Sequence, residues 1–134
     1  SSPRRSASRS SGNDMRTSLL LLLAACAAVF APLAAGHAFL DHAEPAVGST
    51  VHAPPAEVKL WFTQELEPAF SGVQVSDSTG KRVDQGDARV DGNDATLLTV
   101  SVHALGPGRY RVSWRVVSVD THATEGDFSF DVAR

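Results

Sequence analysis

Sulfur is scarce in this sequence. Its 134 residues include one cysteine, Cys26, and one methionine, Met15, so residues 37–134 contain neither. Without thiols or thioethers, that segment can form no disulfide and offers no soft sulfur ligand to a metal. Long apolar runs are also absent. The apolar stretch from Leu19 to Phe30 has 12 residues and is followed by Ala31 and Pro32, whereas a transmembrane helix needs about 20.

Positive charge is limited as well. Residues 37–134 carry eight basic and fourteen acidic side chains, which gives a net charge of −6. This balance argues against nucleic acid and anionic membrane surfaces as partners, and it is compatible with binding a cation. The chain also lacks a nucleophile elbow, a His-Glu-x-x-His zinc motif, a phosphate-binding loop and a dinucleotide fingerprint. Four aspartates follow no calcium-loop spacing and are expected to be solvated turn residues: Asp84, Asp87, Asp91 and Asp94.

The first 36 residues are typical of targeting sequence. Residues 1–14 are rich in serine and arginine and cannot support a core. We interpret them as a disordered or mis-annotated extension, with a twin-arginine-like signal as the alternative. Residues 15–36 have the order of a signal peptide, with one positive charge, the apolar run and then small residues. The sequence therefore predicts cleavage before His37 and export of a soluble product. A cut after Ala38 stays open, and so does a lipoprotein-type cut at Cys26.

From residue 37 onward, the pattern is that of short β-strands separated by turns. In the clearest one, Arg109 to Ser118, apolar and polar residues alternate with the period of a half-buried strand. Turn signals such as Gly106-Pro107-Gly108 separate the strands, and no stretch has a helical period. The expected strands are Glu57–Thr63, Gly72–Ser76, a weak Ala88–Val90, Thr96–Val102, Arg109–Ser118 and Gly126–Val132. About seven short strands in one domain predict an all-β fold, a small antiparallel Greek-key β-barrel or sandwich of immunoglobulin-like type.

Two polar clusters have the chemistry of a metal site. If cleavage frees the α-amine of His37, the amine and the imidazole can chelate one ion, and copper(II) displaces the amine proton most readily. Asp120 and His122 form an Asp-x-His pair whose side chains point the same way in an extended segment. Asp120 either ligates directly or orients His122. Spacing alone favours a plainer interpretation, with a turn-capping Asp120 and an exposed His122. The other histidines are expected at the surface: His52, His103 and, unless it is a weak further ligand, His42.

Several stretches together resemble the CopC family of copper-resistance proteins. The most specific is Trp114-Arg115-Val116-Val117-Ser118-x-Asp120-Thr121-His122, and the others are Pro45-Ala46-x-Gly48-Ser49, Val58-x-Leu60-x-Phe62-Thr63 and Gly126-x-Phe128-x-Phe130-x-Val132. The resemblance covers residues 37–134. It implies a small Greek-key β-barrel exported to the periplasm and a copper(II) site made of His37, Asp120 and His122. It also implies an inner-membrane copper transporter of the CopD type as partner.

Two features depart from the family pattern. No methionine lies between residues 76 and 95, where some members carry a Met-rich copper(I) site, so transfer between two sites in one molecule is not expected. Gln64, followed by Glu65, stands where an acidic residue is common. The sequence predicts a non-enzymatic periplasmic carrier or buffer of copper(II) that serves copper homeostasis and resistance. The alternatives are a copper monooxygenase with a histidine brace and a metal-free immunoglobulin-like interaction module.

Overall fold

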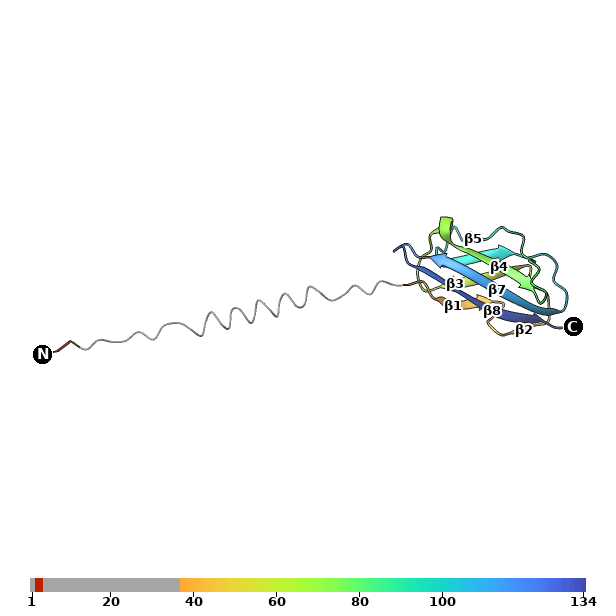
Figure 1. Cartoon of the computed structure of the whole chain (residues 1–134), viewed down its shortest axis with the longest axis horizontal. Helices are drawn as coiled ribbons and strands as arrows, with labels where there is room; N and C mark the ends of the chain where they lie inside the picture. Colours follow the sequence, from red (N-terminus) through yellow and green to blue (C-terminus); the bar gives the residue numbers. More distant parts are fainter. Residues whose placement is uncertain (1, 4–36) are drawn as a thin grey trace. The chain divides into compact units, whose positions relative to one another are not determined.

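The computed structural model describes residues 2–3 and 37–134, so nearly all of the expected extension (1–14) and the whole expected signal peptide (15–36) lie outside the described residues. From residue 37 onward, the structure has eight strands and one short 3-10 helix (Figure 1). These elements are β1 (Leu40–Glu44), β2 (Thr50–Val51), β3 (Glu57–Phe62), η1 (Pro68–Phe70), β4 (Gly72–Asp77), β5 (Arg89–Val90), β6 (Leu97–Ser101), β7 (Gly108–Val117) and β8 (Ala123–Val132).

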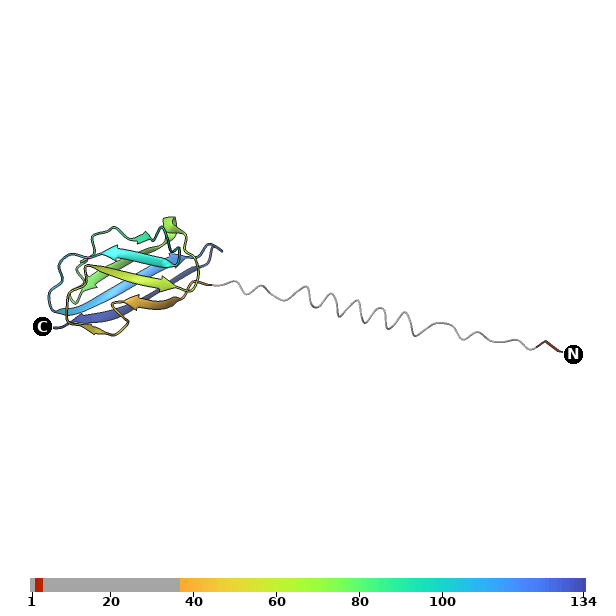
Figure 2. The ribbon, with the colours of Figure 1, turned by 180° about the vertical axis from the view of Figure 1, so that it is seen from behind.

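The strands form two four-stranded sheets that pack face to face. One sheet has the order β1-β3-β6-β5 and the other β2-β8-β7-β4. The second sheet faces the reader in Figure 1, and the view from behind in Figure 2 brings β1, β3 and β6 to the front. The predicted all-β sandwich is confirmed. One pair departs from the antiparallel rule, because the two-residue β2 runs parallel to the end of β8.

Alternating apolar residues build the core between the sheets. On β3, Val58, Leu60 and Phe62 are buried, while the residues between them are half-buried on the outer face. Tyr110 on β7 packs on Phe130 of β8, with ring centroids 5.6 Å apart. A strand that presents apolar side chains on one face is stabilised by covering that face with a second sheet. The period-two pattern of the sequence therefore identifies the core strands correctly.

The ends of the predicted strands agree with the structure to within one residue, except at the start of β8, and two strands, β1 and the two-residue β2, were not predicted. β1 was not expected as a strand, because the register shifts between Leu40 and His42 and this irregularity interrupts the apolar alternation. β8 begins at Ala123 instead of Gly126, because its first residues continue the pairing with the end of β7. These residues are exposed or half-buried, so no apolar alternation marks them in the sequence.

Asp84 corrects the expectation of four solvated turn aspartates. It is only 8% exposed, and its carboxylate accepts the backbone N–H groups of Val75 and Gly86, each at 3.0 Å. The guanidinium of Arg82 donates to the same carboxylate at 2.7 Å. Because Val75 lies on the edge strand β4, this buried carboxylate occupies hydrogen-bonding positions that a neighbouring strand would otherwise fill. Asp84 is therefore a structural residue of the sheet edge.

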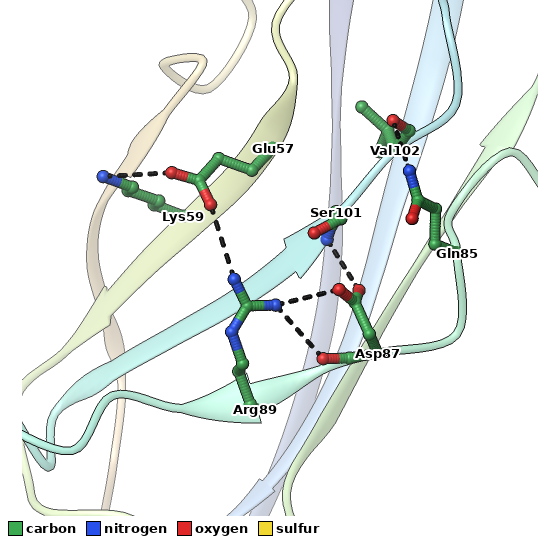
Figure 3. A network of polar contacts seen from close by, with 7 residues as sticks. All are labelled: Glu57, Lys59, Gln85, Asp87, Arg89, Ser101 and Val102. Carbon is green, nitrogen blue, oxygen red and sulfur yellow. Dashed lines mark hydrogen bonds and ion pairs between the residues drawn. The ribbon is translucent and has the colours of Figure 1, made fainter.

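A polar network covers part of the outer face of the first sheet (Figure 3). Arg89 of β5 lies 3.6 Å from Glu57 and 3.0 Å from Asp87, and Glu57 also pairs with Lys59 at 3.3 Å. Asp87 in turn accepts the backbone N–H of Ser101 at 2.8 Å. Exposed ion pairs contribute little each, about 0–1 kcal/mol. Their shared effect is to tether the very short β5 to β3 and to the end of β6.

Candidate metal centre

The backbone at the start of the domain is tied to both sheets. Ala38 is completely buried, whereas His37 is exposed. The hydroxyl of Thr124, on β8, donates to the carbonyl oxygen of Ala38 at 2.6 Å. The hydroxyl of Thr63, just after β3, donates to the carbonyl of His37 at 3.3 Å and accepts the N–H of Phe39 at 3.0 Å. The segment that carries His37 is thus held at a defined place on the sandwich.

The Asp-x-His pair lies in the tight loop between β7 and β8. Ser118, at 1% exposed, is buried below it. The backbone N–H of Ser118 donates to the carbonyl of His122 at 3.0 Å, and its hydroxyl donates to Oδ1 of Asp120. Thr121 has a φ of 74°, in the left-handed region that β-branched residues rarely adopt. The loop is therefore a closed turn with its ends bonded to each other.

Asp120 and His122 contact each other directly. Oδ1 of Asp120 lies 3.1 Å from Nδ1 of His122. The hydrogen bond from the Ser118 hydroxyl is the main reason that the pKa of Asp120 falls below its usual value; desolvation opposes this shift, and His122 adds to it. An ionised carboxylate only accepts hydrogen bonds, so the proton of this contact belongs to Nδ1 of His122, and in the neutral imidazole the lone pair is then on Nε2.

The two expected clusters meet. The ring centroids of His37 and His122, 85 positions apart in the chain, are 4.5 Å apart, and their planes make an angle of 30°. In the part of the chain that the structure describes, no three histidine, cysteine, aspartate or glutamate side chains are arranged to hold one metal ion. The two rings are stacked on each other. The His122 side chain is 43% exposed.

The remaining candidates lie elsewhere or take other contacts. Nδ1 of His42 is 2.7 Å from Asp41, and its ring stacks on Trp61 at a centroid distance of 4.4 Å. Glu65 is exposed, and its backbone carbonyl accepts the N–H of Val119 at 3.1 Å. Glu65 therefore borders the Asp-x-His loop through its backbone. The two histidines expected at the surface are exposed there: His52 and His103.

Sequence reasoning missed the hydroxyl residues that support the cluster. The sequence pattern places Ser118 within a motif only and assigns no role to Thr63 or Thr124. The available signal was their position: Thr124 lies two residues after His122, and Ser118 two residues before Asp120. Hydroxyl side chains so close to proposed ligands are common hydrogen-bonding partners of those ligands or of their backbone.

The fold and the cluster together define a class: a small two-sheet β-sandwich with two imidazoles and a carboxylate gathered where the chain enters the fold. The CopC domain model matches residues 40–133, and the chain belongs to the CopC family. Copper resistance protein C of Pseudomonas syringae pv. tomato is 34% identical over 123 residues, covering 87% of this chain and 96% of that protein. Protein YobA of Escherichia coli K12 is 32% identical over 124 residues, covering 92% and 98%.

Solved structures agree with this assignment. CopC from Methylosinus trichosporium OB3b superimposes with a TM-score of 0.68 and 40% identity, covering 72% of this chain and 94% of that one. PcoC, a methionine-rich copper resistance protein from Escherichia coli, gives a TM-score of 0.63 and 30% identity, covering 72% and 99%. The expected family and fold are confirmed.

The family assignment also fixes the broad function. The chain is a copper-resistance protein of the CopC family, whose members bind copper and are not enzymes. Within the described residues, no helix has both the length and the apolar character needed to cross a membrane. A groove of about 580 Å³ in that part of the chain includes neither of the stacked histidines nor Asp120 among its lining residues. The cluster is an open surface site.

Proposed function

We propose that this chain is a periplasmic carrier or buffer of copper(II), which it binds through His37, Asp120 and His122. The stacking of His37 on His122 at 4.5 Å carries this proposal. It brings the first residue of the expected mature chain to the Asp-x-His loop. Two imidazoles, one carboxylate and one amine are hard or borderline donors that suit copper(II) in a tetragonal arrangement. Copper is the cargo in this function.

The α-amine of His37 becomes a ligand only if the leader ends at residue 36. Burial supports this boundary: Ala38 is completely buried and bonded through its carbonyl, whereas His37 is exposed. A cut after Ala38 would remove a core residue together with one imidazole. A cut at Cys26 would leave the nitrogen of His37 inside a peptide bond, where it is not basic. We therefore assign residues 15–36 to the signal peptide and residues 37–134 to the copper-binding domain.

Each ligand then has an assigned donor atom. The amine and Nδ1 of His37 close a six-membered chelate ring on the ion. His122 presents Nε2, because its Nδ1 donates to Asp120. Asp120 presents Oδ2, because its Oδ1 already accepts the Ser118 hydroxyl. Three nitrogens and one oxygen complete the plane that copper(II) prefers.

The lack of sulfur ligands supports the proposed compartment, and a similarity to a transport protein supports the proposed partner. Residues 37–134 contain no methionine or cysteine, so copper(I) lacks the soft ligands it prefers, and the site suits an oxidising compartment such as the periplasm. Copper transport protein CutJ of Bacillus subtilis is 29% identical to this chain over 99 residues. The match covers 73% of this chain but only 18% of that protein. This match to one part of a longer transport protein supports an inner-membrane transporter of the CopD type as the partner.

Intact-mass analysis of the exported protein, followed by competition titration with copper(II), tests the proposal. We expect a mass that begins at His37 and one tightly bound copper(II) ion per chain. A matched protein with a single alanine ahead of His37 keeps every side chain but loses the free amine at this position. We expect that addition to weaken binding as severely as His122→Ala does. Undiminished affinity in the extended protein would overturn the amine as a ligand.

A further inference from the structure

The segment that carries His37 is fixed by two threonines from opposite sheets. We infer that Thr63 and Thr124 are positioning residues of the copper site, which hold the chain terminus so that His37 and the Asp-x-His loop act as one site. This inference rests on the proposed function. It concerns residues that contact neither the proposed donor atoms nor the ion.

The hydrogen bonds involve only the backbone of residues 37–39. Thr124 donates to the carbonyl of Ala38 at 2.6 Å. Thr63 donates to the carbonyl of His37 at 3.3 Å and accepts the N–H of Phe39 at 3.0 Å. Both threonines therefore act on the position of His37 without occupying any of its donor atoms, and its amine and imidazole remain available.

A chain terminus needs such restraint. The first residues of a domain fray unless other parts of the fold hold them, and β1 begins only at Leu40. A loose terminal histidine still chelates copper(II) through its own amine and ring. It would then hold the ion away from His122 and Asp120. These two ligands would no longer be kept at a high effective concentration near the ion, and the affinity for copper(II) would fall. Three hydrogen bonds of the two threonine hydroxyls, together with the backbone bond from the N–H of Thr63 to the carbonyl of Phe39 at 2.9 Å and the buried Ala38, oppose this separation.

Thr124 also links the two halves of the site directly. It lies on β8 two residues after His122, so its bond to Ala38 connects the strand that begins at the Asp-x-His loop to the terminal segment. Thr63 connects the same segment to the end of β3 in the other sheet. Displacement of the terminus from the loop therefore requires breaking hydrogen bonds to both sheets.

The test uses Thr63→Val, Thr124→Val and the double variant, each processed to begin at His37. Valine keeps the shape of threonine and removes only the hydroxyl. We expect the double variant to bind copper(II) roughly 10–100-fold more weakly, the loss typical of outer partners of metal ligands. Its copper(II) electron paramagnetic resonance spectrum should change toward that of a short peptide beginning His-Ala, since fewer nitrogens remain in the plane.

Two controls separate positioning from general stability. Thr124→Ser retains the hydroxyl that Thr124→Val removes, so its copper(II) affinity and its spectrum should match those of the wild type. Thr50→Val alters an exposed threonine on β2 and should leave both unchanged. Denaturant unfolding of the metal-free variants checks that they are folded. If the folded double variant binds copper(II) with the wild-type affinity and spectrum, the inference is wrong. If the correctly processed wild type binds no copper(II), the proposed function itself fails.

Discussion

Oδ1 of Asp120 lies 3.1 Å from Nδ1 of His122, and the same oxygen accepts the hydroxyl of the buried Ser118. One carboxylate oxygen thus selects the protonated nitrogen of the imidazole, and a buried side chain holds that carboxylate in place. In the proposed copper(II) site, the Nε2 atom of His122 and the Oδ2 atom of Asp120 are the two atoms of this loop that bind the ion. Hydrogen bonds within the loop therefore orient the side chains of Asp120 and His122 in the proposed site.

Substitution of the loop residues should weaken copper(II) binding unequally. We expect His122→Ala to lower the affinity by at least about 100-fold, because it removes a nitrogen ligand, whereas loss of an outer partner costs about 10–100-fold. Asp120→Asn should cost roughly 10-fold, because the amide keeps an oxygen but loses the negative charge. Competition titration against a chelator measures both. His103→Ala, at an exposed histidine outside the cluster, should bind as the wild type does; an equal loss in all three variants would contradict the assigned site.

The close packing of Trp114 on Gly126 should make residue 126 intolerant of any side chain. A Cβ built on Gly126 would lie 2.6 Å from Cζ2 of Trp114, well inside van der Waals contact. We expect Gly126→Ala to lower the free energy of unfolding by about 1–3 kcal/mol, the range for overpacking a core. Gly92→Ala is the matched control, since a Cβ there meets nothing within 4 Å, and it should change stability by less than about 0.5 kcal/mol. Similar urea midpoints for the two variants would refute the steric explanation.

The buried Asp84 should make the stability of the domain depend on pH in acid. Burial alone would raise the pKa of Asp84, but hydrogen bonds from Arg82, Val75 and Gly86 outweigh it and hold the pKa below 3.8. A lowered folded-state pKa stabilises the fold above the unfolded-state value near 4, and this contribution is lost as the pH falls through the folded-state pKa.

Asp84→Asn should therefore destabilise the protein by about 2 kcal/mol at pH 7, the scale of a hydrogen bond to a charged group. The difference from the wild type should shrink below about pH 4. Denaturant titrations at pH 7 and pH 3 measure it, and Glu125→Gln, at an exposed site, serves as the control. A difference that stays constant between the two pH values would rule out the charge of Asp84 as the cause.

The left-handed backbone of Thr121 should carry a small cost in stability. With a φ of 74°, this β-branched residue occupies a region that asparagine tolerates better. We expect Thr121→Asn to raise the free energy of unfolding by about 0.5–1 kcal/mol, since it relieves part of the strain at this turn. Thermal and denaturant unfolding of the metal-free protein test this, and a loss of stability would show that the threonine side chain contributes more than its backbone costs.

The sequence by itself determined the core strands. The apolar–polar alternation on β3 or β7 is a property of neighbouring residues, and its apolar face must be covered by a second sheet. The sequence also supplied the residue types of the site, since a histidine after a cleavage pattern and an Asp-x-His pair have recognisable chemistry. It did not reveal β1, where the register shift interrupts the alternation, nor the burial of Asp84.

Only the tertiary structure decided that His37 lies against His122. Their contact depends on β1 joining one sheet while β8 begins in the other, and on Thr63 and Thr124 fixing the terminal backbone between them. Such contacts join residues far apart in the chain, and they form when the two sheets pack together. No local pattern encodes them, because their energy comes from burial and hydrogen bonds that exist only after the sheets have met.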